Sequence, residues 1–285
     1  MIGRLRGWEK ATLNVEIISL LHCAVMPSAM ANLRIATFNT WNCQGGFDRR
    51  LALMSLGLKA LNADIILAQE VFSQTPSGED VARTLAQALG MNVAHAPARK
   101  KLRSLNGAPV LSCSGLAVLT RGPIRDHQIV RLPEDPRDGE RLGQVVSTII
   151  DKQDVLLANV HLSHLAGEDD LRRRQLDTLM GQVARAPEHD VMVLGGDMNM
   201  TTAQPALVSL QTELGFVCGG HDALVATTLN PVGVDAVDMG VIDHVFVKAD
   251  GGCRVRAHTA LDAPDDATGL FPSDHMAVVV DIELN

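Results

Sequence analysis

The stretch VMVLGGDMN, residues 191–199, joins an apolar run to two glycines and then to a carboxylate and an amide. An unbroken run of Val, Met and Leu is typical of a strand that is covered on both faces. Asp197 follows that run directly, and burying a carboxylate without a partner is costly. We therefore treat Asp197 as a candidate functional residue, together with Asn199.

Short apolar runs alternate with amphipathic stretches along the rest of the chain. Strands are predicted at 33–38, 63–69, 115–120, 144–150, 154–160, 191–196, 241–247 and 275–283. Helices are predicted at 48–62, with Asp48 as N-cap, and at 79–90, 168–186 and 204–216. Strands outnumber helices and several follow one another directly, which favours mixed or antiparallel sheets with helices outside. The polar stretches with glycine and proline are predicted to be surface loops: 97–114, 121–143 and 218–240.

Composition limits the function. Lys and Arg total 25 against 33 Asp and Glu, and the net charge of −8 weakens the case for broad, non-specific nucleic-acid binding. The chain has six Phe, two Trp and no Tyr, which disfavours base-stacking platforms and excludes chemistry that needs a tyrosine hydroxyl. Five scattered cysteines without a CxxC pair indicate reduced thiols.

The first 30 residues allow three interpretations. Basic residues precede the apolar run 17–26, and Ala29-Met30-Ala31 fits a signal-peptide cleavage site. The acidic residues nearby and His22 within the run argue against a signal, so we rank a translation start at Met26 or Met30 first. A folded N-terminal helix ranks last. Residues 31–285 are expected to form one catalytic domain, which is monomeric, has no transmembrane anchor and is cytoplasmic unless a signal peptide directs secretion.

Polar residues recur where the predicted strands end, and neighbouring strands would bring them to one rim. They are Asn39, Glu70, His161, Asp197, Asn199, Asp243, Asp274 and His275. Singly, each could be a turn residue, a cap or an ordinary histidine. Jointly, Asn39 and Glu70 with Asp274 nearby offer the hard oxygen ligands that suit Mg²⁺ or Mn²⁺.

The remaining rim residues suit proton transfer and phosphate binding. Asp197 can take a proton from water, and Asn199, on the same side of an extended segment, can orient a phosphate oxygen. His161 and His275 can donate hydrogen bonds to phosphoryl oxygens. Asp243 can hold His275 in one tautomer and favour its charged form. The set suits in-line attack of water on a phosphoester, with a metal ion neutralising the developing charge.

These residues also carry a family resemblance through six motifs in order: FNTWN (38–42), LAQEV (67–71), NVHLSH (159–164), GGDMN (195–199), VIDHVFV (241–247) and PSDHMAV (272–278). They resemble the motifs of the endonuclease/exonuclease/phosphatase superfamily, which includes deoxyribonuclease I, exonuclease III-type enzymes, neutral sphingomyelinases and inositol polyphosphate 5-phosphatases. The resemblance implies a four-layer α/β sandwich, with two mixed or antiparallel sheets packed face to face and helices on both outer faces.

The resemblance implies roles for the same residues. Asn39 and Glu70 form the metal site with Asp274 beside it, His161 binds phosphate or acts as an acid, Asp197 and Asn199 orient the nucleophile, and Asp243 and His275 form the dyad. Arg121 stands in a family-like position and is expected to bind substrate. The run ARKKLR (98–103) is either a solvated charge run or a substrate contact, whereas RRR (172–174) is expected to be solvated.

The expected function is hydrolysis of a phosphoester, most simply a phosphodiester, with Mg²⁺ or Mn²⁺ as cofactor. The substrate stays open among nucleic acid, phospholipid and a small phosphoester. The absence of Tyr is unlike the abasic endonucleases, and residues 241–258 lack the aromatic hairpin of secreted sphingomyelinases. The alternatives are a nuclease, a sphingomyelinase-like phospholipase and, from another class, a catalytically silent binding module.

Overall fold

The computed structural model describes residues 32–74, 80–218, 224–229 and 240–285. The predicted N-terminal extension, residues 1–30, lies outside the described residues, as does much of the predicted loop 218–240. The described cysteines, Cys43, Cys113, Cys218 and Cys253, are free thiols. No helix in the described ranges is both long and apolar enough to cross a membrane.

The first sheet is mixed, because β1 and β2 run parallel while its other pairs are antiparallel. Its strands follow the order β12-β13-β1-β2-β5-β3, and β4 also pairs with β5. Their bounds are β1 (Asn32–Asn39), β2 (Ile65–Gln74), β3 (Asn92–Ala96), β4 (Lys101–Leu105), β5 (Ala108–Thr120), β12 (Cys253–Ala260) and β13 (Ala277–Leu284).

The second sheet is also mixed, with β8 and β9 as its parallel pair. Its order is β10-β11-β9-β8-β7-β6. Its strands are β6 (Ile124–Arg131), β7 (Leu142–Ile150), β8 (Gln153–His161), β9 (Val191–Asp197), β10 (Val217–Cys218) and β11 (Asp243–Ala249).

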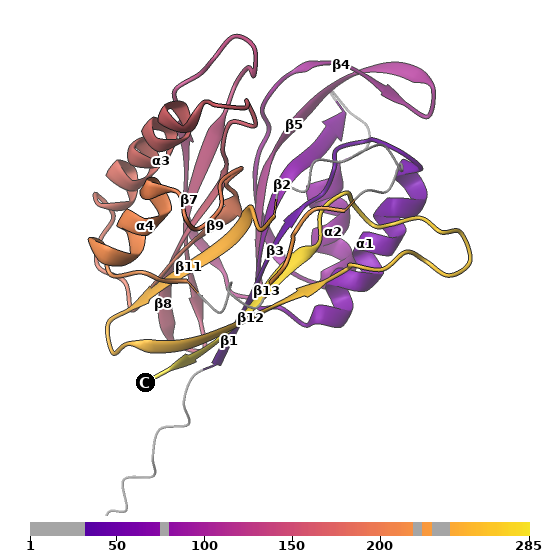
Figure 1. Ribbon diagram of the computed structural model, residues 1–285. Coiled ribbons are helices and arrows are strands. Elements are labelled where there is room, and N and C mark those ends of the chain that lie inside the picture. The colour runs from indigo at the N-terminus through magenta and orange to yellow at the C-terminus, as the bar shows by residue number, and fades with distance from the viewer. Residues whose placement is uncertain (1–31, 75–79, 219–223, 230–239) are drawn as a thin grey trace, which may run out of the picture.

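Helices cover the outer face of each sheet, as Figure 1 shows. On the first sheet lie α1 (Phe47–Leu61) and α2 (Val81–Leu89), and on the second lie α3 (Asp169–Val183) and α4 (Pro205–Thr212). A central apolar cluster joins the inner faces of the two sheets and includes Ile35, Leu67, Leu157 and Val193. Burial of such side chains out of water is the main stabilising term of this core. The predicted four-layer sandwich of two sheets is confirmed.

Several strands lie where loops were predicted, and these predictions were wrong. The range 97–114 contains β4 and the first half of β5, and 121–143 contains β6. β6 and β12 consist of exposed and half-buried side chains, so they lack the apolar runs by which buried strands are recognised. Asp48 is not the N-cap of α1, since Gly46 occupies that position and Asp48 lies in the first helical turn.

The pairing register explains why the strand-end residues meet. Parallel strands end at the same edge of a sheet, and Asn39 is aligned with Gln69 while His161 is aligned with Asp197. The antiparallel strand β11 begins at the same edge, with Asp243 opposite Asp197. Both parallel pairs therefore end at one rim of the sandwich.

Candidate active site

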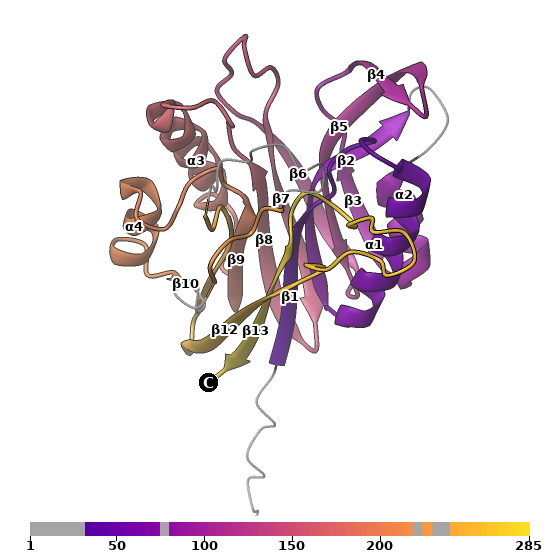
Figure 2. The same cartoon turned by 45° about the vertical axis from the view of Figure 1, so that its right-hand side comes forward.

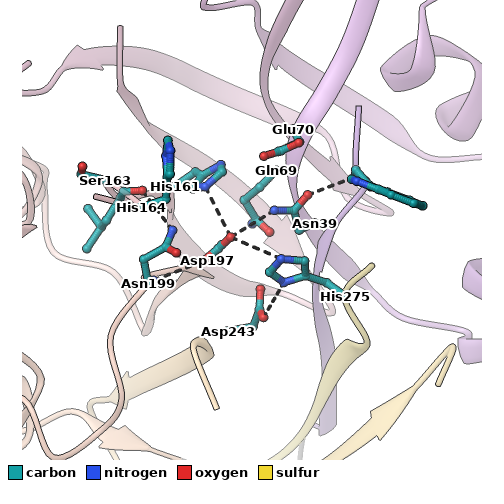
Figure 3. Close-up of polar contacts among 12 residues, drawn as sticks. Asn39, Gln69, Glu70, His161, Ser163, His164, Asp197, Asn199, Asp243 and His275 are labelled. Carbon is teal, nitrogen blue, oxygen red and sulfur yellow. Dashed lines mark hydrogen bonds and ion pairs between the residues drawn. The ribbon is translucent and has the colours of Figure 1, made fainter. Parts of the chain in front are cut away.

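Asp197 is the centre of the rim and lies at the end of β9, 2 % exposed (Figure 3). Its Oδ2 atom accepts a hydrogen bond of 3.0 Å from Nδ2 of Asn39, and its Oδ1 atom accepts one of 3.1 Å from the backbone N–H of Asn199. Burial, and then the neighbouring Asp243 carboxylate, raise the pKa of Asp197 to about 7. The carboxyl group is therefore poised to gain or lose a proton near neutral pH.

His275 and Asp243 form a buried pair beneath this carboxyl group. Nδ1 of His275 lies 2.9 Å from Oδ2 of Asp243, and Nε2 of His275 lies 3.9 Å from Oδ2 of Asp197. Burial alone would lower the pKa of His275, but the charge and hydrogen bond of Asp243, followed by Asp197, raise it to about 10. The imidazole is consequently cationic at neutral pH, and the hydrogen bond fixes its orientation.

His161 faces Asp197 from the end of β8, with Nε2 at 3.3 Å from Oδ2 (Figure 3). Burial first, and then Arg141 and His275, lower the pKa of His161 well below its usual range. His161 therefore contacts Asp197 as a neutral imidazole, and the two do not form an ion pair. A neutral imidazole can still donate one N–H to a phosphoryl or leaving-group oxygen.

Asn199 differs from the extended geometry expected for it. Strand β9 ends at Asp197, and Asn199 has a left-handed backbone with φ of 49°. Its Nδ2 atom donates to the carbonyl of Leu162, 3.2 Å away, so the side chain fastens the segment after β8 to the end of β9. Asn199 contributes to the site mainly by its backbone hydrogen bond to Asp197.

Glu70 is turned to the rim by a β-bulge in β2. The register with β5 shifts between Ala68 and Val71, and Glu70 has a φ of 51°. A bulge of this kind re-aims a side chain that regular alternation would direct elsewhere. Nδ2 of Asn42 donates to Oε2 of Glu70 at 3.3 Å and helps to fix the orientation of the carboxylate.

The oxygen atoms around Glu70 fit a divalent cation. Burial raises the pKa of Asp274 to about 6, and the negative charge of Glu70 adds to this effect against the opposing charge of His275. Oδ1 of Asn42 is buried and has no hydrogen-bond partner among the described residues. Oδ1 of Asn39 accepts one bond, from the backbone N–H of Trp41, and keeps a second lone pair. Two carboxylates with spare amide oxygens are the kind of donor set that Mg²⁺ and Mn²⁺ prefer.

A second group of possible ligands is formed by Asp197, Asp243 and His275, whose ligand atoms lie within 4.8 Å of one another. These residues are buried and could hold a metal ion. Nδ1 of His275 is already engaged with Asp243, however, and the raised pKa of His275 disfavours the neutral imidazole that metal ligation needs. The carboxylate pair Glu70 and Asp274 is thus the better candidate cation site.

Two buried polar arrangements support the rim. Amide side chains link the sheets, since Gln69 donates to Asn159 at 2.8 Å and Asn159 donates to Gln144 at 3.2 Å. Arg50 is 1 % exposed and donates to five backbone carbonyls, including those of Thr40 at 3.1 Å and Pro272 at 2.8 Å. Arg50 therefore ties the segment after β1 to the one that carries Asp274 and His275.

The glycines before Asp197 make room for neighbouring strands. A Cβ atom on Gly195 would lie 2.7 Å from Leu67 of the opposite sheet. One on Gly196, whose φ is +143°, would lie 1.9 Å from the carbonyl oxygen of Val160. The close packing of β9 against β8 and β2, rather than phosphate binding, accounts for both glycines.

Arg121 does not lie at the rim with the other predicted site residues. It follows β5, whose last residue Thr120 is aligned with Ile65 at the beginning of β2, whereas Glu70 lies farther along β2. Five residues of strand separate the two positions by roughly 16 Å. Arg121 instead donates to Asn62 at 2.6 Å and approaches Asp64 at 3.7 Å.

Other basic residues, Arg99 and Arg141, line the narrow pocket that holds Glu70 and His161. Arg141 is 3 % exposed and donates twice to Asp138, at 2.9 and 2.6 Å. Arg99 belongs to the run ARKKLR, whereas nothing in the sequence around Arg141 distinguishes it from a solvated arginine.

The three arginines of the run RRR differ in burial. Arg173 and Arg174 are exposed, as predicted, whereas Arg172 is buried. Arg172 donates to the carbonyls of Ser163 and Leu165 at 3.0 and 2.8 Å. It therefore holds the segment that follows His161.

Solved structures share this fold. An endonuclease/exonuclease/phosphatase from Beutenbergia cavernae is 23 % identical, with 89 % of this chain and 72 % of that chain covered and a TM-score of 0.66. TDP2 from Caenorhabditis elegans is 16 % identical, with coverage of 91 % and 78 % and a TM-score of 0.68. A mannosyl-6-phosphatase from Bacteroides thetaiotaomicron is 18 % identical, with coverage of 88 % and 99 % and a TM-score of 0.65.

Sequence comparison agrees with the structural likeness. Among curated proteins, none matches the chain. The profile of the Endonuclease/Exonuclease/phosphatase family matches residues 39–275, which include every candidate strand-end residue from Asn39 to His275. The chain therefore belongs to the Endonuclease/Exonuclease/phosphatase family.

Proposed function

We propose that the chain is a divalent-cation-dependent hydrolase that cleaves a phosphodiester by in-line attack of water on phosphorus. The observation that carries the proposal is the buried pair of Asp243 and His275, which holds a cationic imidazole 3.9 Å from Asp197. A fixed positive charge beside a carboxyl group of pKa about 7 suits a reaction that moves a proton from water while negative charge develops on phosphoryl oxygens.

Each side chain has a proposed role. Asp197 accepts the proton of the attacking water at its carboxylate, and Asn39 and the backbone of Asn199 orient that carboxylate. His275 stabilises charge on the phosphoryl oxygens and is held by Asp243. His161, being neutral, donates its N–H to the phosphate or to the leaving oxygen. This last bond would assist departure of the leaving group.

The cation has a separate place in the proposal. Glu70 and Asp274, with Oδ1 of Asn39, would hold Mg²⁺ or Mn²⁺, which supplies neutralisation of phosphoryl charge when bound. The unpaired buried Oδ1 of Asn42 and the raised pKa of Asp274 support a cation at this position.

A substrate panel with and without metal tests the proposal. We expect bis-p-nitrophenyl phosphate to be hydrolysed with Mg²⁺ or Mn²⁺ and not with EDTA. Oligonucleotides, sphingomyelin vesicles, inositol phosphates and sugar phosphates assayed alongside separate nuclease, phospholipase and monoesterase activity. Folded protein that hydrolyses no member of the panel with either cation would overturn the proposal and support a binding module.

A further inference from the structure

A second hollow opens beside the candidate active site. It has a volume of about 440 Å³. Its charged lining comes from Arg99, Lys100, Lys101, Arg137, Asp138 and Glu140. We call it the basic groove. Arg99 and Glu140 also line the narrow pocket that contains Glu70 and His161, so the groove adjoins the proposed reaction site.

The positive charge of the groove is only partly compensated. Arg137 is paired with Asp135 at 2.7 Å and with Glu168 at 2.5 Å. Asp138 accepts two hydrogen bonds from Arg141, and Arg99 approaches the same carboxylate only to 3.9 Å.

Lys100 and Lys101 are exposed, and neither has a carboxylate partner in the part of the chain that the structure describes. The groove is thus a local excess of positive charge on a chain whose net charge is −8. Such an excess attracts anionic ligands.

The backbone beneath these cations is firmly held. The carbonyl of Ala98 accepts from the N–H of Ser114 at 2.8 Å, and the N–H of Arg99 donates to Glu140 at 3.0 Å. Gly115 lets this segment lie directly on β5, since a Cβ atom there would be 2.0 Å from the carbonyl oxygen of Ala96. A fixed backbone lowers the entropy cost of holding a ligand at this position.

The adjoining hairpin of β4 and β5 separates its charged and apolar sides. It extends past the end of the sandwich on the side of β2 and β5 (Figure 2). Alternation along β4 puts Lys101 and Leu102 on opposite faces. Leu102 and its cross-strand neighbour Leu111 are 68 % and 41 % exposed. Two leucines without an aromatic side chain are a small apolar area for entering a membrane, so the concave, cationic side is the better binding surface.

We propose that the basic groove binds a second phosphate group of the substrate, so that the enzyme prefers phosphoesters carrying another phosphate beside the scissile one. This inference rests on the proposed hydrolase function. The ligand chemistry is a phosphate within reach of Arg99, Lys100 and Lys101. It is supplied either by the next nucleotide of a chain or by a polyphosphorylated small molecule.

The test compares substrates that differ by one phosphate. The dinucleotide TpT is compared with pTpT and TpTp, and glycerophosphoinositol with glycerophosphoinositol phosphates, so that the scissile bond is a phosphodiester in every case, as kcat/KM at fixed Mg²⁺ and low salt. In one of these pairs we expect a gain of about tenfold from the added phosphate, as two or three partly exposed ion pairs would provide. The pair that shows the gain identifies the source of the phosphate.

A double variant, Lys100→Ala with Lys101→Ala, should lose most of that gain. The matched control is Lys59→Ala with Lys248→Ala, two exposed lysines on α1 and β11, which should keep it. For a nucleic-acid substrate, log kcat/KM should also fall less steeply with log salt in the Lys100/Lys101 variant, by about 0.7 for each phosphate that a lysine no longer neutralises.

Failure of this inference is distinguishable from failure of the proposed function. Equal rates with and without the second phosphate, in an enzyme that still hydrolyses bis-p-nitrophenyl phosphate, would overturn the groove assignment alone. So would a Lys100/Lys101 variant that loses only its binding to anionic vesicles and keeps the substrate preference. No hydrolysis of any phosphoester by the folded wild-type protein would instead overturn the proposed function.

Discussion

Replacing Asp243 with Asn tests the electrostatics of the site without changing its shape. An amide oxygen at this position can still accept a hydrogen bond from Nδ1 of His275, so the main loss is one buried negative charge. That charge is the largest contribution raising the pKa of His275 from 6.5 to about 10, against the lowering effect of burial. At about 1.4 kcal/mol per pKa unit, the whole shift corresponds to roughly 5 kcal/mol in favour of the cationic form.

The assay is an NMR pH titration of the His275 ring, assigned by comparison with a His275→Gln variant. In the wild-type, metal-free protein the ring should stay protonated beyond pH 8. In Asp243→Asn the pKa of His275 should fall by about two units or more, because less negative charge then opposes the lowering effect of burial. A fall of less than about half a unit would refute the assignment of Asp243 as the main source of the shift.

The Asp243→Asn substitution should also change how the free energy of unfolding depends on pH. A histidine whose pKa is raised in the folded state contributes stability that is fully present below its unfolded pKa of 6.5 and is lost as pH rises through about 10. The raised carboxyl pKa of Asp197 acts in a lower window, where stability falls as pH rises from 3.8 to about 7. Between about pH 7.5 and 10, the wild type should therefore lose unfolding free energy that Asp243→Asn does not lose.

Three further changes test other parts of the site. Arg50→Met leaves five backbone carbonyls without their donor and should cost about 3 kcal/mol or more in denaturant unfolding; a loss below about 1 kcal/mol would contradict its role. Gly196→Ala should lower unfolding free energy by about 3 kcal/mol, whereas Gly181→Ala within α3, with nothing near its Cβ, should not lower it. Glu70→Gln should weaken Mn²⁺ binding in calorimetry about tenfold or more, while exposed Glu213→Gln leaves it unchanged.

The strand-end residues could be predicted because one physical rule places them. Parallel neighbours end at the same edge, so residues that directly follow apolar strands meet there whatever their separation in sequence. Asn39 and Asp197 are 158 residues apart and share a hydrogen bond of 3.0 Å. The rule does not apply to Arg121, because β5 is antiparallel to β2. The end of β5 therefore lies at the opposite edge of the sheet.

The supporting residues could not be predicted because their environment is created by tertiary structure. Asp138 and Arg141 stand in a polar stretch that resembles any surface loop, yet they are 3 % exposed each. Asn159 and Gln69 were parts of recognised motifs, but their hydrogen bond joins two sheets whose packing no local pattern specifies. The edge strands β6 and β12 have half-exposed faces, so the apolar signal that identifies the central strands is missing from them.

The role of Asp197 as proton acceptor is tested by the kcat of Asp197→Asn with bis-p-nitrophenyl phosphate at saturating Mg²⁺. The substitution keeps the size of the side chain and removes the group that accepts the proton. We expect a loss of about 10³-fold or more, equivalent to about 4 kcal/mol of transition-state stabilisation, in a protein that unfolds cooperatively and retains its Mn²⁺ affinity. A folded, metal-binding Asp197→Asn variant with kcat within about tenfold of wild type would contradict this role.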